Sequence, residues 1–467
     1  MNQISYFLNN NSASKKITQR SQDFPQWYQD IIEAADLAEH GPAKGSMIIK
    51  PYGYDVWERI QEELGSRIAA AGVPNMYFPI FIPESLLHRE AKHVEGFSPE
   101  VAVVTHAGGK KLDEPLVVRP TSETIMYESF SKWVNSYRDL PLKINQWANV
   151  VRWEMRPRLF LRSSEFLWQE GHTAHATVEE ADQYAREMLA MYQDVAENVM
   201  AIAPIAGEKS AAERFAGAQA TYTLEAMMQD GKALQFATSH NLGDNFSKAF
   251  DVQYSAEDGS RKYVGQTSWG MSTRTIGGLI MSHSDDKGLV LPPKLAPIQV
   301  VILPVRAEKE VIQAAHKLAE SLDGVRVYVD ERDARIGEKH FAWEKRGVPI
   351  RLEIGPRDIE NKQVIMVARN DEAKQPVSFD QLGSSISNHL ALLQDELFKT
   401  SKARLVENTV ETSDEQAAIK AIEQGKFAKV DFAIDSAKEA ELKAKHAITV
   451  RCYPFEDTGK TILAKAY

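Results

Sequence analysis

A carboxylate and two imidazoles lie close together in the segment FLWQEGHTAHA, residues 166–176. This grouping could bind a metal ion or line a pocket for a small molecule. If the segment is a strand, its side chains alternate between two faces. Phe166, Trp168 and Glu170 then share one face, and two aromatic rings beside a carboxylate suit a small cationic molecule.

The spacing of the two histidines favours the pocket over a metal site. A metal site would need His172 and His175 side by side, which a helix allows. Gly171 and the helix start expected at Thr177 place His172 before that helix, and no further Cys or Asp lies near it in the sequence. Buried structural residues are a second alternative.

Arginines are dense in the preceding segment. A strand VVRWEM would place Arg152 and Glu154 on one face, and the loop that follows adds Arg156, Arg158 and Arg162. The planar guanidinium binds carboxylate or phosphate with two parallel hydrogen bonds. The hairpin is therefore a candidate anion site, with a solvated charged hairpin as the alternative.

Two further segments carry polar side chains next to expected strands. In RPTSETI, Thr121 and Glu123 could face a pocket, or they could form a helix N-cap in which Glu123 favours the dipole. In TSWGMSTRT, Gly270 would allow a ligand to approach the backbone, and Arg274 could stack on a base or pair with a phosphate.

The composition bounds the class of protein. The chain has 467 residues, enough for two or three domains, and its 43% hydrophobic and 26% charged content is typical of globular proteins. A net charge of −10 means that any nucleic-acid contact is local. The single cysteine, Cys452, excludes an internal disulfide, and neither a signal peptide nor a membrane span is expected. We expect a cytoplasmic protein.

The elements that must position these residues change in pattern along the chain. A helix is expected over residues 55–71, where Val56, Ile60, Leu64 and Ile68 form one apolar stripe. Short strands with antiparallel-compatible connections dominate the first part, and LPPKLAP is a possible linker. Strands then alternate with helices, which indicates an α/β domain. The expected divisions are a flexible tail (1–20), an α+β catalytic domain (21–290), an α/β domain (291–400) and a small α+β domain (401–467).

These pieces together resemble the three signature motifs of class II aminoacyl-tRNA synthetases. The closest resemblance is to the prolyl-tRNA synthetases of the archaeal and eukaryotic-like form, carried by RPTSE, RSSEFLWQEGHTAHA, TSHNLGDNFSKAF and TSWGMSTR. The segment ERDARIGEKHFAWEKRGVPIRLEIGPRD resembles that family's anticodon-binding domain. The resemblance covers nearly the whole chain beyond the tail, and it implies the class II fold with an antiparallel sheet.

The resemblance also implies an activity and a set of residues. The enzyme would activate L-proline with ATP and Mg²⁺ and transfer the prolyl group to tRNA(Pro), as a homodimer with no membrane association. Arg152 and Arg274 would be catalytic. Proline would be bound by Thr121, Glu123, Arg152, Trp168, Glu170, His172, Phe215, His240, Ser268 and Gly270. ATP would be bound by Arg152, Glu154, Arg162, Ser163, Phe166, Gln235, Thr238 and Arg274, with Mg²⁺ near Gln235.

The third domain would bind the tRNA anticodon through basic and aromatic side chains. The candidates are Arg332, Arg335, Lys339 and Arg346, with Phe341 or Trp343 available to stack on a base. A solvated helix face is the alternative for these residues.

The sequence departs from the family pattern in two places. Many relatives carry a cysteine-rich zinc site in the C-terminal domain, but here Cys452 stands alone, so no zinc is expected. The spacing between the second and third motifs leaves no room for an editing insertion. Three rivals remain: another class II synthetase, a nucleotide-binding metalloenzyme, and a catalytically inactive synthetase-like protein that binds RNA.

Overall fold

The computed structural model describes residues 16–87, 101–154, 156–371 and 373–467. Most of the expected N-terminal tail, residues 1–15, lies outside these ranges. Arg20 already belongs to the fold, because its backbone N–H donates to Asp286 Oδ1 at 2.8 Å. The first helix of the described residues, α2, follows at Phe24–Ala34.

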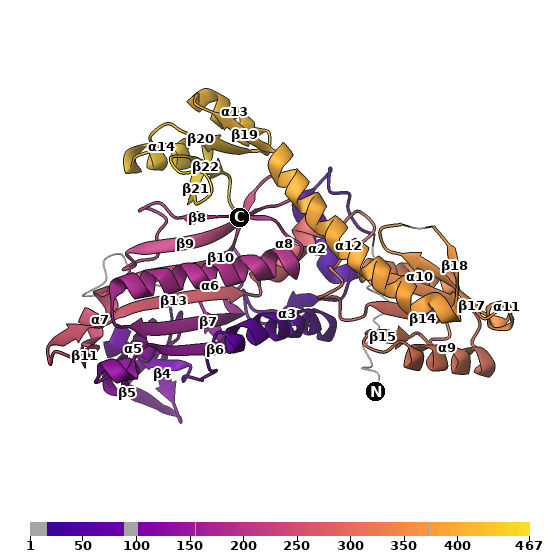
Figure 1. Ribbon diagram of the computed structural model, residues 1–467, viewed down its shortest axis with the longest axis horizontal. Coiled ribbons are helices and arrows are strands. Elements are labelled where there is room, and N and C mark those ends of the chain that lie inside the picture. The colour runs from indigo at the N-terminus through magenta and orange to yellow at the C-terminus, as the bar shows by residue number, and fades with distance from the viewer. Residues whose placement is uncertain (1–15, 88–100, 155, 372) are drawn as a thin grey trace.

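A ten-stranded sheet occupies the centre of the molecule (Figure 1), in the order β19-β20-β22-β21-β8-β9-β10-β13-β7-β6. The six strands from β8 to β6 pair antiparallel throughout, as expected for the catalytic domain. They are β6 (Leu142–Val151), β7 (Glu165–His175), β8 (Pro204–Glu208), β9 (Ala220–Met227), β10 (Ala233–Gly243) and β13 (Gly265–Ser272).

Helix α6 (Val178–Asn198) covers one face of this sheet and leaves the other face open to the site. Strand alternation fixes which side chains reach each face. Gln169 of β7 faces α6 and accepts a hydrogen bond from Tyr192 Oη at 2.5 Å. Its neighbours Trp168 and Glu170 therefore point to the opposite face.

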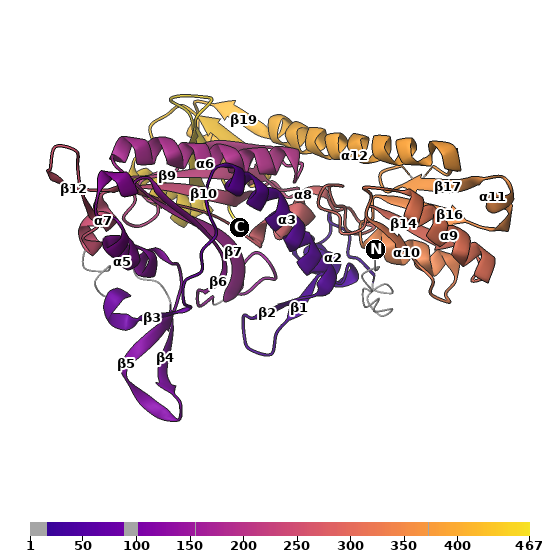
Figure 2. The same cartoon turned by 60° about the horizontal axis from the view of Figure 1, so that its bottom comes forward.

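Helices and small strands surround the sheet. Helix α3 (Pro51–Ala70) begins one turn earlier than expected because Pro51 suits the first helical position, and its predicted apolar stripe is buried. Figure 2 shows β4 and β5 projecting away from the main sheet. The remaining elements of this part are β1 (Ala38–His40), β2 (Met47–Ile49), β3 (Phe81–Pro83), β4 (Ala102–Ala107), β5 (Lys110–Val118), α5 (Glu123–Trp133), η1 (Tyr137–Asp139), α7 (Asn245–Phe250), β11 (Gln253–Ser255), β12 (Arg261–Tyr263) and α8 (Arg274–His283).

The connection to the next domain is packed rather than loose. Leu291, Leu295 and Ala296 are buried in the same apolar core as α2 and α3, and Val301 and Trp343 of the next domain join that core. Arg326 donates to the carbonyl oxygens of Pro293 and Ala296 at 2.8 and 2.9 Å. The expected linker is therefore part of the contact between the two domains.

The α/β domain contains a five-stranded sheet in the order β15-β14-β16-β17-β18. Only the β15-β14 and β14-β16 pairs are parallel, so the sheet is mixed rather than largely parallel. The short β16–β17 connection cannot form a crossover, which forces antiparallel pairing. The elements are β14 (Val300–Pro304), α9 (Lys309–Ser321), β15 (Val327–Val329), α10 (Ile336–Lys345), β16 (Ile350–Ile354), α11 (Pro356–Glu360), β17 (Gln363–Ala368) and β18 (Gln375–Ser378).

One long helix, α12 (Phe379–Glu407), leads from this domain to the C-terminal strands (Figure 1). The boundary expected at residue 400 therefore falls inside a helix. The C-terminal unit is not a separate body either, because its strand β21 pairs with β8 and extends the central sheet. Its elements are β19 (Thr409–Thr412), α13 (Glu415–Glu423), β20 (Phe427–Val430), α14 (Ser436–His446), β21 (Thr449–Pro454) and β22 (Thr461–Ala464).

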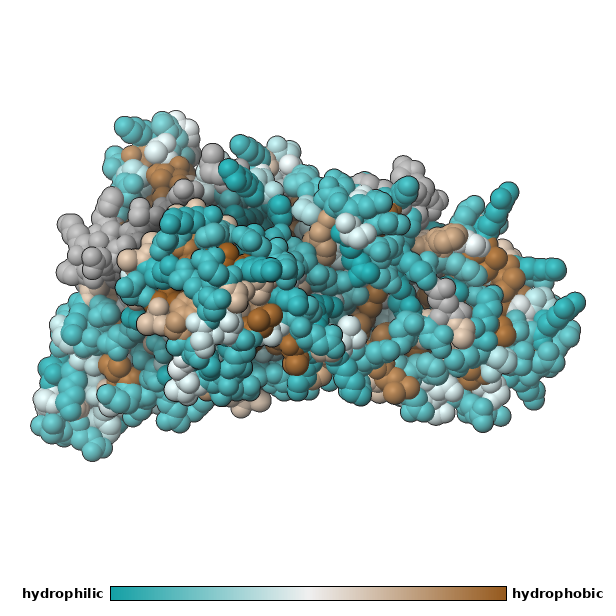
Figure 3. All heavy atoms as spheres, turned by 90° about the horizontal axis from the view of Figure 1, so that it is seen from above, coloured by the Kyte–Doolittle hydropathy of each residue, from teal (hydrophilic) through white to brown (hydrophobic). Residues whose placement is uncertain are grey.

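The molecular surface seen in Figure 3 is mainly hydrophilic, with apolar residues in small separate patches. No helix among the described residues is long and apolar enough to cross a bilayer. Buried apolar side chains of the described residues gather in packed cores.

Candidate active site

A cavity of about 430 Å³ lies on the open face of the central sheet. All ten residues expected to bind proline line it, although they come from β7, β10, β13, the start of α5 and three connecting segments. Five of the residues expected to bind ATP also line it: Arg152, Phe166, Gln235, Thr238 and Arg274. The other three, Glu154, Arg162 and Ser163, lie outside the described cavity lining, on the connection between β6 and β7.

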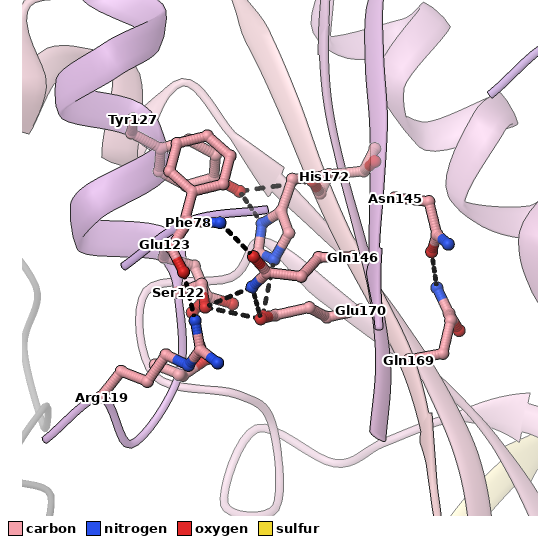
Figure 4. A network of polar contacts seen from close by, with 12 residues as sticks. Phe78, Arg119, Ser122, Glu123, Tyr127, Asn145, Gln146, Gln169, Glu170 and His172 are labelled. Atoms are coloured by element: carbon pink, nitrogen blue, oxygen red, sulfur yellow. Dashed lines mark hydrogen bonds and ion pairs between the residues drawn. The ribbon is translucent and has the colours of Figure 1, made fainter. Parts of the chain in front are cut away.

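Glu170 is the centre of a buried polar network (Figure 4). Its Oε1 accepts hydrogen bonds from Ser122 Oγ at 2.5 Å and from Gln146 Nε2 at 2.8 Å. His172 Nε2 lies 3.1 Å from Glu170 Oε2. Ser122 thus bonds to Glu170 rather than capping α5, although it precedes that helix. The network holds the Glu170 carboxylate in one orientation at the cavity wall.

The Glu170–His172 pair shifts the pKa of both groups. Burial alone would lower the pKa of His172, but the hydrogen bond to Glu170 and the charges of Glu123 and Glu170 outweigh it, so the pKa is raised. Burial would raise the pKa of Glu170, but the bond and charge of His172 reverse this, and the pKa is lowered. Both shifts favour the charged pair. The other ring nitrogen of His172 lies 3.2 Å from Tyr127 Oη.

A second carboxylate, Glu123, lies at the first position of α5 and is almost fully buried. Thr121 Oγ1 donates a hydrogen bond to Glu123 Oε2. The helix N-terminus adds a favourable dipole for the negative charge. The side chain of Ser122 does not cap α5, so only the dipole part of the N-cap alternative remains, and the Glu123 carboxylate at the helix start lines the cavity.

Two guanidinium groups face the same cavity. Arg152 follows β6, and its Nε donates to Pro120 O at 2.9 Å. Its Cζ lies 5.5 Å from the Phe166 ring centroid and 5.4 Å from that of Trp168, within cation–π range. Burial and the nearby charge of Arg152 lower the pKa of Arg274 to about 10, so the Arg274 guanidinium is cationic at neutral pH. The cavity thus holds guanidinium groups together with the carboxylates of Glu123 and Glu170.

An aromatic wall closes another side of the cavity. Phe215 stacks on His240 with the ring centroids 4.7 Å apart, and Thr221 Oγ1 lies 2.9 Å from His240 Nδ1. Burial and the charges of His172 and Arg152 lower the pKa of His240 to about 3, so its ring is neutral. Ser268 Oγ is buried beside this wall and has no hydrogen-bond partner among the described residues. A bound polar molecule would satisfy it.

The structure also explains the glycine in WQEGH. Gly171 pairs with Trp269 of β13, and the indole of Trp269 covers it so closely that an added Cβ would lie 2.1 Å from the ring. Any larger residue would displace the strand that carries Glu170 and His172.

Several cavity residues were missed from the sequence. Lys209, Glu213 and Thr221 line the cavity, and Gln146 supports Glu170 from β6. Strand alternation in INQWANVV could have found Gln146. Lys209 and Glu213 lie on the connection between β8 and β9, which carries no periodic pattern.

The expected anticodon residues require correction. Lys339 and Arg346 are only 3% and 4% exposed, so they cannot contact tRNA directly from these positions. Lys339 Nζ donates to Asp330 O at 2.9 Å. Arg346 lies 3.6 Å from Asp36 and packs against aromatic rings at the contact between the domains. The charged ends of Lys339 and Arg346 therefore make contacts inside the protein and do not face solvent.

Of the other two basic candidates, Arg332 is half-buried and donates two hydrogen bonds to Asp330, whereas Arg335 is exposed. Trp343 is buried and also donates to Asp330, which removes it as a stacking surface, while Phe341 is 63% exposed. A second cavity, of about 420 Å³, opens beside Phe341. Its polar walls include Lys287, His340, Glu344, Arg351 and Arg369.

Metal ligands are sparse. Among the described residues, no group of three or more His, Cys, Asp or Glu side chains could hold a metal ion. Cys452 is fully buried in β21, where burial raises its pKa to about 12. Its thiol is therefore a packing group in this structure.

Known proteins share this arrangement. Residues 105–283 match the family model of the tRNA synthetase class II core domain (G, H, P, S and T), and residues 299–389 match that of the anticodon binding domain. The chain is 51% identical to proline–tRNA ligase 2 of Streptomyces avermitilis over 94% of each chain. It is 49% identical to the chloroplastic/mitochondrial proline–tRNA ligase of Arabidopsis thaliana, over 96% of this chain and 85% of that one.

Among solved structures, the chain matches prolyl-tRNA synthetase from Cryptosporidium parvum, crystallised with halofuginone and AMPPNP. The TM-score is 0.90 at 38% identity, covering 96% of this chain and 99% of that chain.

The antiparallel sheet with its cavity and the two matched models define a class II aminoacyl-tRNA synthetase. Within that class, the chain belongs to the prolyl-tRNA synthetase family. The fold class and the aminoacyl-tRNA ligase activity expected from the sequence are confirmed at this level.

Proposed function

We propose that this cavity activates L-proline with ATP and that the same chain transfers the prolyl group to tRNA(Pro). One observation carries the proposal: residues from β7, β10, β13 and the start of α5 converge on one cavity that holds both buried carboxylates and guanidinium groups. Zwitterionic proline and an anionic nucleotide match that charge distribution.

At the proline end, Glu123 and Thr121 receive the secondary ammonium of proline. A buried carboxylate offsets the cation in a site that excludes water. Trp168, Phe215 and His240 surround the ring, and the neutral state of His240 avoids repulsion of the ammonium. Glu170, His172, Ser268 and Gly270 complete the wall, with Glu170 oriented by Gln146 and Ser122.

At the ATP end, Arg152 bridges the proline carboxylate and the α-phosphate. A carboxylate oxygen of proline attacks the α-phosphorus, and the bond to the pyrophosphate oxygen breaks, so this step needs no general base. Arg152 holds the reacting groups together and offsets the charge that develops at phosphorus. Phe166 and Arg274 hold the adenine, while Gln235 and Thr238 contact the nucleotide.

Glu154, Arg162 and Ser163 are proposed to approach ATP from the β6–β7 connection when nucleotide is bound. Mg²⁺ would enter with the phosphates near Gln235. The amide and hydroxyl oxygens of Gln235 and Thr238 fit a cation that keeps most of its ligands as phosphate and water, and it would offset phosphate charge. The prolyl group then passes to the terminal ribose of tRNA, and AMP leaves.

The anticodon site is proposed at the cavity beside Phe341. Arg335 and Phe341 are exposed, so one is available to a phosphate and the other to a base face. Arg351 adds a guanidinium to the cavity wall, whereas the Arg369 guanidinium there already donates to Asp285 and to Glu344 O. The proposed domain division follows: a catalytic domain to residue 290, an anticodon-binding domain through α12, and a C-terminal unit from β19.

A homodimer is proposed on exposed apolar side chains. Met76, Tyr77, Phe81 and Trp133 are 39–69% exposed and lie on or next to the small sheet of β3, β5 and β4. Burial of such residues favours association.

A cytoplasmic location is proposed because a single buried cysteine is compatible with a reducing compartment.

Charging of tRNA(Pro) with labelled proline, in the presence of ATP and Mg²⁺, tests the whole proposal. Acid-precipitable prolyl-tRNA is expected from the wild-type chain. Failure to charge tRNA(Pro) by a folded protein that binds both ATP and tRNA would contradict it.

A further inference from the structure

The connection between β8 and β9 forms one wall of the active-site cavity. Lys209, Glu213, Phe215 and Ala216 of this segment, residues 209–216, all line the cavity. The backbone N–H of Phe215 donates to Thr221 Oγ1 at 3.0 Å, which supports the stack of Phe215 on His240. The position of this wall segment therefore sets the shape of the end of the cavity assigned to the proline ring.

The C-terminal unit lies directly against the start of this wall segment. Strand β21 pairs with β8 through Pro454 and Gly207, and Figure 1 shows β21 beside β8. The approach is so close that a Cβ on Gly207 would lie 2.5 Å from Tyr453 O. The backbone that enters the wall segment is thus fixed by the last strands of the chain.

A buried ion cluster connects the same strand to Lys209. Lys209 Nζ donates to Glu225 Oε1 at 2.7 Å, and Arg451 of β21 donates to Glu225 Oε2 through Nε and Nη2 at 3.0 and 2.7 Å. The three residues are 2%, 0% and 5% exposed. Because an unpaired buried charge is costly, Arg451 and Lys209 together keep the Glu225 carboxylate ionised and in place.

Helix α14 holds the next residues of the wall segment. Ser210 Oγ donates to Glu439 Oε1 at 2.8 Å, both side chains being buried, and accepts from the backbone N–H of Glu213 at 3.3 Å. Lys443 Nζ lies 3.0 Å from Glu213 Oε1. The hydroxyl of Ser210 thus connects α14 to a backbone group inside the wall segment.

We propose that Glu439 and Arg451 are positioning residues for proline activation: they hold the wall segment 209–216 in the conformation that binds proline. The inference rests on the proposed assignment of this end of the cavity to proline. When these contacts are lost, a smaller fraction of molecules holds the wall segment in the conformation that binds proline. The apparent affinity for proline falls in proportion to that fraction. None of the cavity residues assigned to ATP belongs to the wall segment, so loss of the Glu439–Ser210 bond changes the apparent affinity for ATP less. Arg451 acts closer to the ATP residues, because its partner Glu225 pairs with Gln235.

The test compares Glu439→Ala with Glu439→Gln in proline-dependent ATP–pyrophosphate exchange. Alanine removes the acceptor for Ser210, whereas glutamine retains a carbonyl oxygen that accepts the same hydrogen bond. Ser210→Ala removes the same bond from the other side and keeps the charges of the C-terminal unit intact. Glu441→Ala is the matched control, because Glu441 lies exposed on the same helix and pairs with Lys438 and Lys445.

Glu439→Ala and Ser210→Ala are expected to raise KM for proline about tenfold and to leave KM for ATP within about twofold. Glu439→Gln should restore KM for proline to near the wild-type value, and Glu441→Ala should not change it. Arg451→Met should act in the same direction as Glu439→Ala; if it does not fold, the Ser210 and Glu439 variants decide the question.

Two results overturn the inference while leaving the proposed function intact. One is an unchanged KM for proline in folded Glu439→Ala and Ser210→Ala proteins. The other is an equal rise in KM for proline and ATP, which would indicate general destabilisation. A wild-type protein without proline-dependent exchange would instead contradict the proposed function.

Discussion

Glu170 and His172 lie on the same face of β7, with Glu170 Oε2 and His172 Nε2 3.1 Å apart. Spacing of two along a strand brings the carboxylate and the imidazole together, and neighbouring strands supply Gln146 rather than a further metal-type ligand. The segment therefore forms a wall of the cavity, in which the Glu170 carboxylate is held in one orientation. The third candidate ligand, His175, lies further along the strand and contacts Thr173 at 2.8 Å.

The pair predicts a pH-dependent stability. The raised pKa of His172 means that its contribution is fully present below its ordinary value of 6.5 and is lost as pH rises through the folded-state pKa. The lowered pKa of Glu170 means that its contribution is present above its ordinary value of 4.5 and is lost as pH falls through the folded-state pKa. The stability lost in His172→Gln should therefore be largest between these two values.

Urea unfolding of wild type and His172→Gln from pH 4 to pH 9 measures this difference. It should shrink at both ends of the range. His106→Gln, at an exposed position of β4, is the control. A difference that stays constant with pH would show that the pair is not charged in the folded protein.

Arg152→Ala should lower the rate of adenylate formation by about a hundredfold or more, because the group that offsets charge at phosphorus is lost. The protein should stay folded, since Arg152 makes its hydrogen bond at the cavity edge. ATP–pyrophosphate exchange and circular dichroism check both expectations, with Arg261→Ala, an exposed arginine of β12, as the control. Turnover near the wild-type rate would mean that the anion site is misplaced.

Glu123→Gln should raise KM for proline about tenfold or more, because a charge-assisted contact to the ammonium becomes a neutral one. KM for ATP should change little. Glu128→Gln, five residues further along α5 and outside the cavity lining, is the matched control. Equal effects of the two substitutions on proline binding would contradict the role of Glu123.

Two arginines of the anticodon-binding domain should behave differently when replaced. Arg335→Ala should weaken tRNA charging and leave proline activation unchanged, because Arg335 is exposed and far along the chain from the cavity residues. Arg346→Ala should instead lower the free energy of unfolding by about 1–3 kcal/mol, because it removes a buried group that packs on Tyr52 and Trp343.

Aminoacylation kinetics and thermal unfolding of both variants distinguish these roles. A loss of proline activation in Arg335→Ala would contradict the domain assignment. An unchanged stability of Arg346→Ala, combined with a specific loss of tRNA charging, would restore Arg346 as a tRNA contact.

Much of the fold followed from the sequence because local patterns are strong there. The apolar stripe of α3 and the alternation in β7 depend only on neighbouring residues, and both were found where predicted. The division expected at residue 400 falls inside α12, because this helix continues without a break across that residue. The union of β21 with β8 depends on residues far apart in the chain, which no local pattern reveals.

The same distinction between local patterns and contacts of distant residues applies to the site. Short motifs identified the residues of β7, β10 and β13, and the structure brings them to one cavity. Lys339 and Arg346 were assigned to tRNA because basic residues are usually exposed. Their burial arises from contacts with Asp330 and with Asp36, which lies about three hundred residues away in the chain. Lys209 was missed because its partner Glu225, and Arg451, which donates to the same carboxylate, lie on separate strands.

The most direct test of the central claim is amino-acid-dependent ATP–pyrophosphate exchange, measured with each of the twenty amino acids and without tRNA. We predict strong exchange with proline, and at most weak exchange with smaller residues, since lost apolar contacts are worth only about 1–3 kcal/mol. Strong exchange with a different amino acid, or none from a folded protein that still binds ATP, would contradict the proposed proline site.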